Sequence, residues 1–267
     1  MAIAGYAAAV FIGISLGLIG GGGSILTVPV LVYLFNLDAV AATAYSLFIV
    51  GTTSTVGSIS YFRKGLVSIR TAVVFGIPAV AAIFLTRTYV LPAIPTHIFA
   101  IGSLDLTKDM ALMLLFAVLM IIAFYSMVKQ HNPQKAGKIK QGTYHYPLIF
   151  IQGVYIGAIT GLIGAGGGFL IIPVLVNLRQ TPMKIAVGTS LVIIAANSLM
   201  GFIFSLPYVW PRWDFLLSIA GIAVIGVLIG SYLATKIEGN KLKPAFGWFV
   251  LAMGGYIIMK EMLVLVR

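Results

Sequence analysis

The sequence Gly-Leu-Ile-Gly-Gly-Gly-Gly-Ser-Ile-Leu-Thr-Val-Pro-Val-Leu at residues 17–31 occurs a second time, as Gly-Leu-Ile-Gly-Ala-Gly-Gly-Gly-Phe-Leu-Ile-Ile-Pro-Val-Leu at residues 161–175. The two copies lie 144 residues apart, and 11 of 16 positions are identical between residues 17–32 and 161–176 without a gap. Pairs such as Ser46 and Ser190 continue the match at the same offset. The chain is therefore predicted to contain two copies of one structural unit.

The composition is that of a membrane protein. Of the 267 residues, 60% are hydrophobic and only 9% are charged, and the mean hydropathy is +1.09. A soluble domain has about 25% charged residues. Between Met1 and Phe62 the only charged side chain is Asp38, which leaves room for spanning helices. The predicted fold class is an all-α polytopic membrane protein.

Apolar runs bounded by charged or turn residues divide each copy into about five helical segments. They are residues 3–19, 25–35, 39–61, 69–87 and 110–128 in the first copy and 147–163, 169–178, 184–205, 213–235 and 245–265 in the second. The predicted organisation is a first transmembrane repeat at 1–128, a basic cytoplasmic linker at 129–146 and a second transmembrane repeat at 147–267. The N-terminus lacks the basic region of a signal peptide and is expected to form the first helix.

The distribution of charge predicts the orientation. The net charge is +11, and the Lys and Arg residues lie in short breaks between apolar runs rather than on one soluble face. This positive-inside pattern favours contact with anionic lipids and no contact with nucleic acid. With the linker inside, Asp38 and residues 88–109 and 208–213 fall outside. Each copy then has an odd number of crossings, so an inverted-topology repeat is expected, an architecture common among secondary transporters.

The glycine runs are predicted to be the tips of helical hairpins. Residues 25–35 and 169–178 are shorter than the roughly 20 residues that a spanning helix needs. Glycine tolerates positive φ and lets the backbone approach a ligand closely. The helix that follows each run is expected to direct free N–H groups and the positive end of its dipole at the tip, which favours an anion. Close helix packing is the alternative role of these glycines.

Neutral polar side chains of the next helix are expected to line the same site. No Asp, Glu, Lys, Arg or His falls in the middle of a predicted span, so backbone N–H groups and neutral side chains are expected to hold the substrate. Hydrogen bonding within or between helices is the alternative role of these hydroxyl groups. The candidate substrate-binding residues are Gly20, Gly21, Gly22, Gly23, Ser24, Tyr45, Ser46, Ser54, Gly164, Gly166, Gly167, Gly168, Thr189, Ser190 and Asn197.

The sequence offers no candidate for catalysis. It contains no cysteine, and its three histidines, His97, His131 and His145, fall in predicted loops or at the end of the linker. Neither a nucleophile with a base nor a metal-ligating set falls within the predicted spans. No enzyme activity, cofactor or metal is expected.

The doubled glycine motif resembles that of the sulfite exporter TauE/SafE family, as do Ala44-Tyr45-Ser46 and Gly188-Thr189-Ser190 in the helix that follows. The resemblance covers nearly the whole chain, although the long segment 88–109 departs from the family pattern. It implies a multi-pass permease of the prokaryotic inner membrane that moves sulfite, sulfoacetate or other organosulfur anions.

The predicted function is thus a secondary transporter that binds a small sulfur-containing anion near the membrane midplane, between the two glycine-rich hairpins. A passive anion channel, or a permease for another small organic anion, is the alternative. Coupling to protons or sodium, the direction of transport and the oligomeric state are left open.

Overall fold

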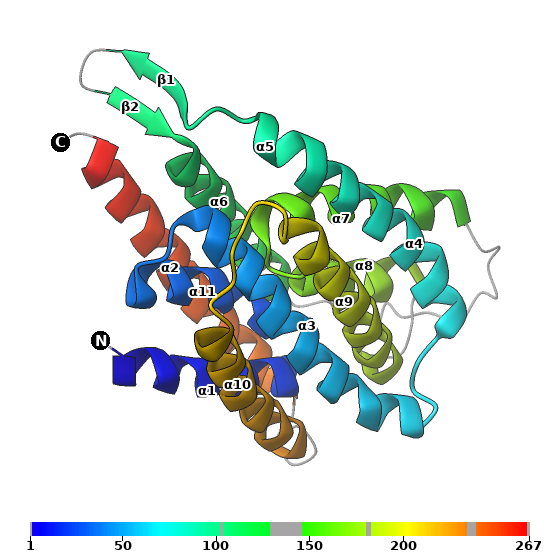
Figure 1. Cartoon of the computed structure of the whole chain (residues 1–267). Coiled ribbons are helices and arrows are strands. Elements are labelled where there is room, and N and C mark those ends of the chain that lie inside the picture. Colours follow the sequence, from blue (N-terminus) through cyan, green and yellow to red (C-terminus); the bar gives the residue numbers. More distant parts are fainter. Residues whose placement is uncertain (1, 102–103, 129–145, 180–182, 234–238, 266–267) are drawn as a thin grey trace.

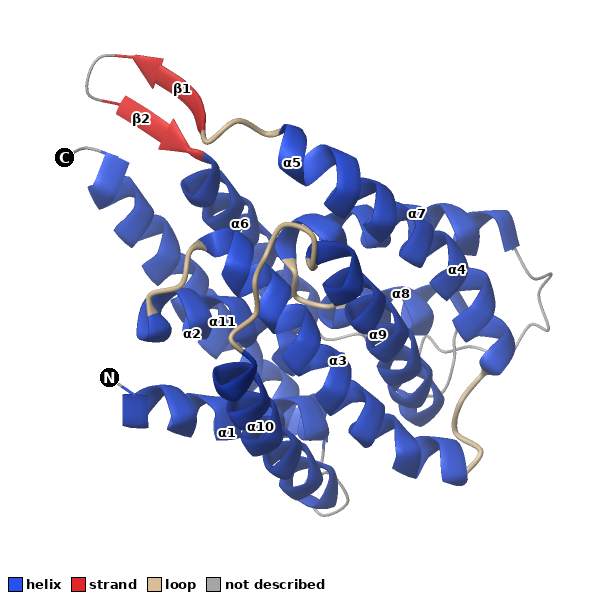
Figure 2. Cartoon of the chain, in the orientation of Figure 1, coloured by secondary structure: helices blue, strands red, loops and turns tan. Residues whose placement is uncertain are grey.

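The computed structural model describes residues 2–101, 104–128, 146–179, 183–233 and 239–265, and nearly all of them are helical (Figures 1 and 2). The first half contains α1 (Ala2–Ile19), η1 (Gly21–Leu26), α2 (Thr27–Phe35), α3 (Ala39–Arg63), α4 (Ile69–Leu85), η2 (Thr86–Val90), α5 (Leu91–Ala93), β1 (His97–Ile101), β2 (Leu104–Thr107) and α6 (Lys108–Val128). The second half contains α7 (Tyr146–Ile163), α8 (Gly168–Arg179), α9 (Met183–Ser205), α10 (Trp213–Leu233) and α11 (Gly239–Leu265). The predicted linker lies outside the described residues, except for its last residue, Tyr146.

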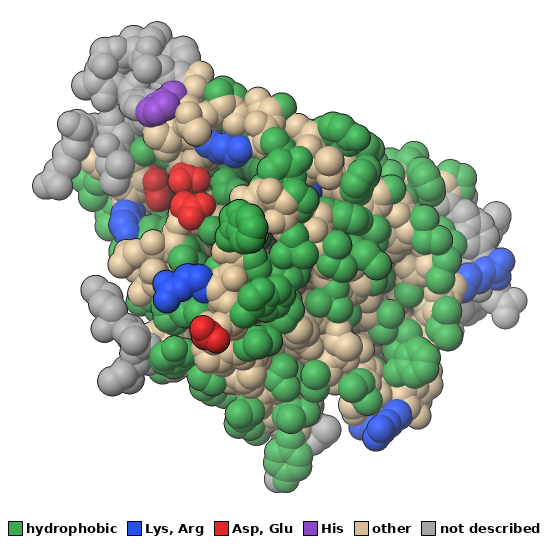
Figure 3. Space-filling model, in the orientation of Figure 1, with side chains coloured by type: hydrophobic (Ala, Val, Ile, Leu, Met, Phe, Trp, Pro, Cys, Tyr) green, Lys and Arg blue, Asp and Glu red, His purple; other side chains and the backbone are tan. Residues whose placement is uncertain are grey.

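Length and composition confirm an all-α polytopic membrane protein. Among the described residues, five helices are long and apolar enough to cross a membrane: Ala39–Arg63, Ile69–Ala93, Lys108–Tyr125, Lys184–Ser205 and Trp213–Leu233. Figure 3 shows one face of the molecule, where apolar side chains cover the middle and charged side chains lie toward the ends. On this face, an apolar middle between charged ends matches the apolar core and polar surfaces of a bilayer.

Helices α3 and α9 cross in the interior and run antiparallel. A Cβ atom on Gly57, near the end of α3, would lie 3.8 Å from Leu191 Cδ1, near the start of α9. At the other end of the crossing, a Cβ atom on Gly201 would lie 3.0 Å from Leu47 Cδ1. Gly57 and Gly201 are equivalent in the repeat, as are Leu47 and Leu191. The two halves therefore make the same contact twice, once in each direction.

The outer helices also pack across the two halves. Helix α1 packs on α10, and its counterpart α7 packs on α4, the counterpart of α10. Glycine permits both contacts, because a Cβ atom on Gly13 would lie 2.1 Å from the Ala223 oxygen and one on Gly157 would lie 2.4 Å from the Ala79 oxygen. These two pairs share the 144-residue offset. At Gly13 and Gly157, close helix packing is what glycine provides.

The segment after α4 differs from the predicted loop. Helical structure continues beyond residue 87 through the π-helix η2 and the short α5, as far as Ala93. Pro92 sits in the first turn of α5, where proline is tolerated, and Ile94 is extended, as expected before Pro95. Strands β1 and β2 then form an antiparallel hairpin. Arg87, predicted to end a span, consequently lies inside the longer apolar helical run Ile69–Ala93, which corrects the prediction that no charged residue falls within the middle of a span.

The connections predicted to share one side of the membrane do meet at one end of the molecule. The Tyr45 hydroxyl, near the start of α3, accepts a hydrogen bond from the Arg212 backbone N–H at 2.7 Å. The Tyr208 hydroxyl donates to the Thr88 carbonyl oxygen at 3.2 Å. At the opposite end of α3, the Ser68 N–H donates to Thr189 Oγ1 near the start of α9, at 2.9 Å.

Candidate functional site

The second glycine run forms an irregular turn between α7 and α8. Gly164, Gly166 and Gly167 have φ angles of 73°, 67° and 68°, a region that side-chain-bearing residues rarely adopt. The chain therefore leaves helical geometry here, as predicted, and α8 begins at Gly168. The first turn of α8 is directed back at this tip.

The first glycine run adopts a different structure. Gly20 alone has a positive φ angle, 74°, and the chain then forms the 3₁₀-helix η1, which leads directly into α2. The prediction that the whole run leaves helical geometry is therefore right at Gly20 and wrong for Gly21, Gly22, Gly23 and Ser24. The Ser24 hydroxyl contributes to this outcome, because it donates to the Gly21 carbonyl oxygen at 2.7 Å and stabilises the turn.

The two tips touch each other in the interior. A Cβ atom on Gly21 would lie 2.4 Å from Gly168 Cα, and one on Gly168 would lie 2.4 Å from Gly21 Cα. The side chain of Ile194, on α9, lies against both glycines. A Cβ atom on Gly23 would lie 2.4 Å from Ser15 Oγ, so the first tip also packs tightly on α1. No side chain fits between the tips, which explains glycine at both positions.

Several polar side chains along α3 and α9 are buried without a hydrogen-bond partner. Ser46 and Ser54 on α3, and Asn197 and Ser198 on α9, are at most 1% exposed. Neither Asn197 amide atom and none of the three hydroxyl oxygens has a partner among the described residues. Leaving such a group unpaired costs about 1 to 3 kcal/mol. We refer to these four side chains as the crossing residues.

The crossing residues reach the second tip at Ser198. A Cβ atom on Gly166 would lie 2.7 Å from Ser198 Oγ, and equally close to Val50 Cγ1 on α3. A Cβ atom on Gly51 would lie 2.8 Å from Leu199 Cδ2. This contact and those at Gly57 and Gly201 place Asn197 near the middle of the crossing. The second tip, the middle of α9 and the middle of α3 therefore meet.

Three other candidates have hydroxyl groups that are already bonded elsewhere. Tyr45 bonds the connection before α10, Thr189 Oγ1 accepts from the N–H of Ser68, and Ser190 Oγ donates to the Val187 oxygen at 2.8 Å. These are the interhelical and intrahelical bonds that form the alternative role of such groups. The structure thus separates the candidates with satisfied hydroxyls from those with unpaired groups.

Replacing Tyr45 by phenylalanine is expected to destabilise the end of the molecule where the connections meet. The change removes the acceptor of the Arg212 N–H and the donor to the Trp210 oxygen, at 2.7 and 3.4 Å. We expect a loss of about 1 to 2 kcal/mol, seen as a lower melting temperature in detergent. Tyr155→Phe on α7 is the control, because Tyr155 is 67% exposed. Equal melting temperatures for the two variants would contradict this role of Tyr45.

Some polar residues in this region lie outside the set of candidate residues. Ser198 is the repeat equivalent of the candidate Ser54, and the 144-residue offset alone relates the two. Thr160 Oγ1, which is also buried and has no hydrogen-bond partner among the residues that the structure describes, would lie 2.3 Å from a Cβ atom on Gly167. Arg87 is 1% exposed, and its position as the only Lys, Arg, Asp or Glu between Arg70 and Asp105 was the available signal.

The described part of the chain contains no group of three or more His, Cys, Asp or Glu residues that could hold a metal ion. The polar groups gathered at the tips are backbone amides, hydroxyls and one carboxamide. Such groups bind a ligand by hydrogen bonds rather than by metal coordination.

These features define a multi-pass α-helical membrane protein in which two glycine-rich tips meet in the interior. The family model for the sulfite exporter TauE/SafE matches residues 5–257. The chain belongs to this family, and it is a membrane transporter.

Relatives that match this chain over most of its length occur in bacteria and archaea. A probable membrane transporter protein of Xylella fastidiosa (strain Temecula1) is 28% identical over 254 residues, which cover 94% of this chain and 92% of the relative. One from Methanocaldococcus jannaschii is 26% identical, with 87% and 84% covered. The probable membrane transporter protein YdhB of Bacillus subtilis is 25% identical, with 84% and 85% covered. No solved structure matches the chain.

Proposed function

We propose that the protein is a secondary transporter of small sulfur-containing anions, such as sulfite or organosulfonates, in the inner membrane of a prokaryotic cell. The observation that carries the proposal is the set of buried, unpaired polar groups at the point where the second glycine tip meets α3 and α9. Membership of the sulfite exporter family supports the substrate class. Relatives in bacteria and an archaeon support the location.

The chemistry of this site favours an anion. The tip places glycine backbone beside Ser198 and directs the start of α8 inward, and N–H groups at a helix start favour negative charge. The Asn197 amide and the hydroxyls of Ser46 and Ser54 add donors that no described protein group uses. In a buried site, hydrogen bonds to a charged ligand contribute more than those to a neutral one.

The close contact between the tips favours a carrier over a channel. Gly21 and Gly168 approach so closely that a single Cβ atom would clash, which leaves no open path between the tips. A carrier needs such a closed contact on one side of its site at a time, and transport then requires the tips to separate in turn. Because equivalent contacts occur twice between the two halves, each half can open its side of the site while the other half keeps its side closed.

Inverted repeats are part of this proposal, and the antiparallel crossing of α3 and α9 supports them. Single cysteines can test the topology, because the natural chain has none. Lys64 lies after α3, and Trp210, 93% exposed, lies in the equivalent connection after α9. A membrane-impermeant maleimide is expected to label Lys64→Cys and Trp210→Cys from opposite sides of the membrane. Labelling of both from one side would contradict the inverted arrangement.

The substrate class is tested by flux into liposomes that contain the purified protein. Sulfite, thiosulfate, sulfoacetate, taurine and sulfate form the panel, and protein-free liposomes give the background. We expect at least one of the sulfur-containing anions to enter well above background and to compete with the others. Background rates for the whole panel would overturn the proposed substrate class.

A further inference from the structure

A second group of unpaired donors lies at the end of the molecule where the connections meet. Arg87 is in the π-helix η2, a distortion that is frequent at functional sites. Its guanidinium donates from Nη1 to Thr43 Oγ1 at 3.1 Å, while Nε and Nη2 have no hydrogen-bond partner in the described part of the chain. A buried charge is strongly unfavourable unless a partner compensates it. The candidate site of the tips does not include this residue.

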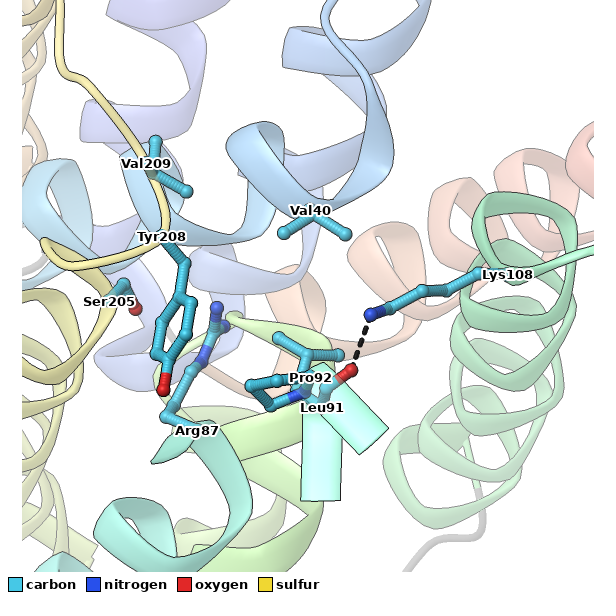
Figure 4. Close-up of a pocket in the computed structure, with 8 residues that line it drawn as sticks. All are labelled: Val40, Arg87, Leu91, Pro92, Lys108, Ser205, Tyr208 and Val209. Carbon is cyan, nitrogen blue, oxygen red and sulfur yellow. Dashed lines mark hydrogen bonds between the residues drawn. The ribbon is translucent and has the colours of Figure 1, made fainter. Parts of the chain in front are cut away.

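Arg87 lines a pocket with a volume of about 210 Å³ (Figure 4). In this view, Arg87 extends beside the Tyr208 ring and Lys108 extends from the opposite side, with Pro92 between them. The volume is below the range of about 300 to 1,000 Å³ that is typical of pockets for drug-sized ligands. The pocket therefore suits a small ion. The residues that line it are Val40, Arg87, Leu91, Pro92, Lys108, Ser205, Tyr208 and Val209.

Among the described residues that line the pocket, two are cationic and none is acidic. The Lys108 ammonium group donates to the Leu91 carbonyl oxygen and holds its charge at the pocket wall. Two carboxylates lie nearby, but both bond the first turn of α3. Asp38 accepts from the Ala41 N–H at 2.9 Å, and Asp109, which also lies close to Lys108, accepts from backbone N–H groups of that turn. Neither carboxylate is a hydrogen-bond partner of Arg87.

Thr43 connects this pocket to the second glycine tip. Thr43 accepts the Arg87 hydrogen bond with its side chain, and its backbone lies against Gly164. A Cβ atom on Gly164 would lie 2.3 Å from the Thr43 carbonyl oxygen. A Cβ atom on Gly161, at the end of α7, would lie 2.8 Å from Thr86 Cβ. Arg87 and the start of the tip are thus separated by one side chain.

We propose that this pocket is a binding site for a small oxyanion, in which Arg87 Nε and Nη2 donate to two oxygens of the anion and Lys108 supplies a second positive charge. The guanidinium fork matches two oxygens of a sulfite, sulfonate or carboxylate group. The inference rests on the proposed function in one respect: it takes the anion bound in this pocket to be the anion that the protein transports. If the two anions are the same, the anion binds first in this pocket and then moves to the second tip.

The test measures sulfite binding to the purified full chain in detergent, by calorimetry and by the shift in melting temperature, against sodium chloride at equal ionic strength. Arg87→Gln is expected to weaken sulfite binding at least about tenfold, as the loss of charged hydrogen bonds implies. It is also expected to melt no lower than wild type without sulfite, because an unpaired buried charge is removed. Arg212→Gln, an exposed arginine at the same end of the molecule, is the control and is expected to bind sulfite as wild type does.

Lys108→Gln provides a second variant that leaves the buried guanidinium in place, and it too is expected to weaken binding. Wild-type sulfite affinity in both pocket variants would overturn the proposed site. So would a lower melting temperature of Arg87→Gln combined with an unchanged sulfite response, which would assign Arg87 a structural role. Sulfite binding without flux in liposomes would instead overturn the proposed transport function and leave the pocket standing.

Discussion

Replacing Asn197 by leucine is expected to reduce anion transport at least about tenfold while leaving the protein as stable as wild type or more stable. Asn197 is fully buried near the middle of the α3–α9 crossing, and neither amide atom has a hydrogen-bond partner among the described residues. The side chain of leucine branches at Cγ as that of asparagine does, and it removes two unpaired polar atoms from the interior. Initial rates of flux in liposomes and melting temperatures in detergent measure the two effects.

A loss of transport without a loss of stability would distinguish a role of Asn197 in binding the anion from a role in holding the structure together. Thr53→Val is a matched control, because Thr53 is the repeat equivalent of Asn197 and is equally buried, but its hydroxyl donates to the Ile49 oxygen at 2.6 Å. Transport by Thr53→Val is expected to stay close to that of wild type. A leucine at residue 197 that destabilises the protein and spares transport would assign Asn197 a purely structural role.

Replacing Gly166 by leucine is expected to abolish transport. A Cβ atom there would lie 2.7 Å from both Ser198 Oγ and Val50 Cγ1, and the φ angle of 67° is unfavourable for leucine. The new side chain would fill the space between the tip and the crossing residues. Flux in liposomes measures the loss, and size-exclusion chromatography checks that the inserted protein remains folded.

Gly221→Leu is the matched control for this substitution. Gly221 lies in α10, is exposed, and nothing lies within 4 Å of the position of its Cβ atom. The same change there adds apolar surface without strain, so transport is expected to persist. Transport by folded Gly166→Leu at the rate of Gly221→Leu would show that the second tip takes no part in the path of the anion.

The helical architecture was predictable because the hydrophobic effect leaves a strong local signal. The thickness of a bilayer sets the length of the apolar runs, and these runs predicted the bounds of the long helices to within a few residues. Helix α3, for example, was predicted at 39–61 and lies at Ala39–Arg63. The segment after α4 was misjudged because Arg87 was taken as the end of an apolar run. A buried arginine depends on tertiary partners such as Thr43, which are distant in sequence.

The glycine tips show a second limit of sequence reasoning. The two runs are nearly identical, yet Gly166 and Gly167 adopt positive φ angles while their equivalents Gly22 and Gly23 are in a 3₁₀-helix. Glycine permits a left-handed turn without requiring it. Which state forms depends on contacts such as that of Gly167 with Thr160, where the first copy has Leu16. Similarly, sequence could not distinguish bonded hydroxyls, as at Thr189, from the unpaired ones at Ser46 and Ser54.

Counterflow of labelled sulfite tests the central claim, that a buried anion site is exposed alternately to the two sides of the membrane. Liposomes that contain the wild-type protein are loaded with unlabelled sulfite and then receive labelled sulfite outside. The account predicts uptake that saturates with concentration and that is accelerated by the sulfite inside. Uptake that rises linearly with concentration and is indifferent to the internal anion would contradict it.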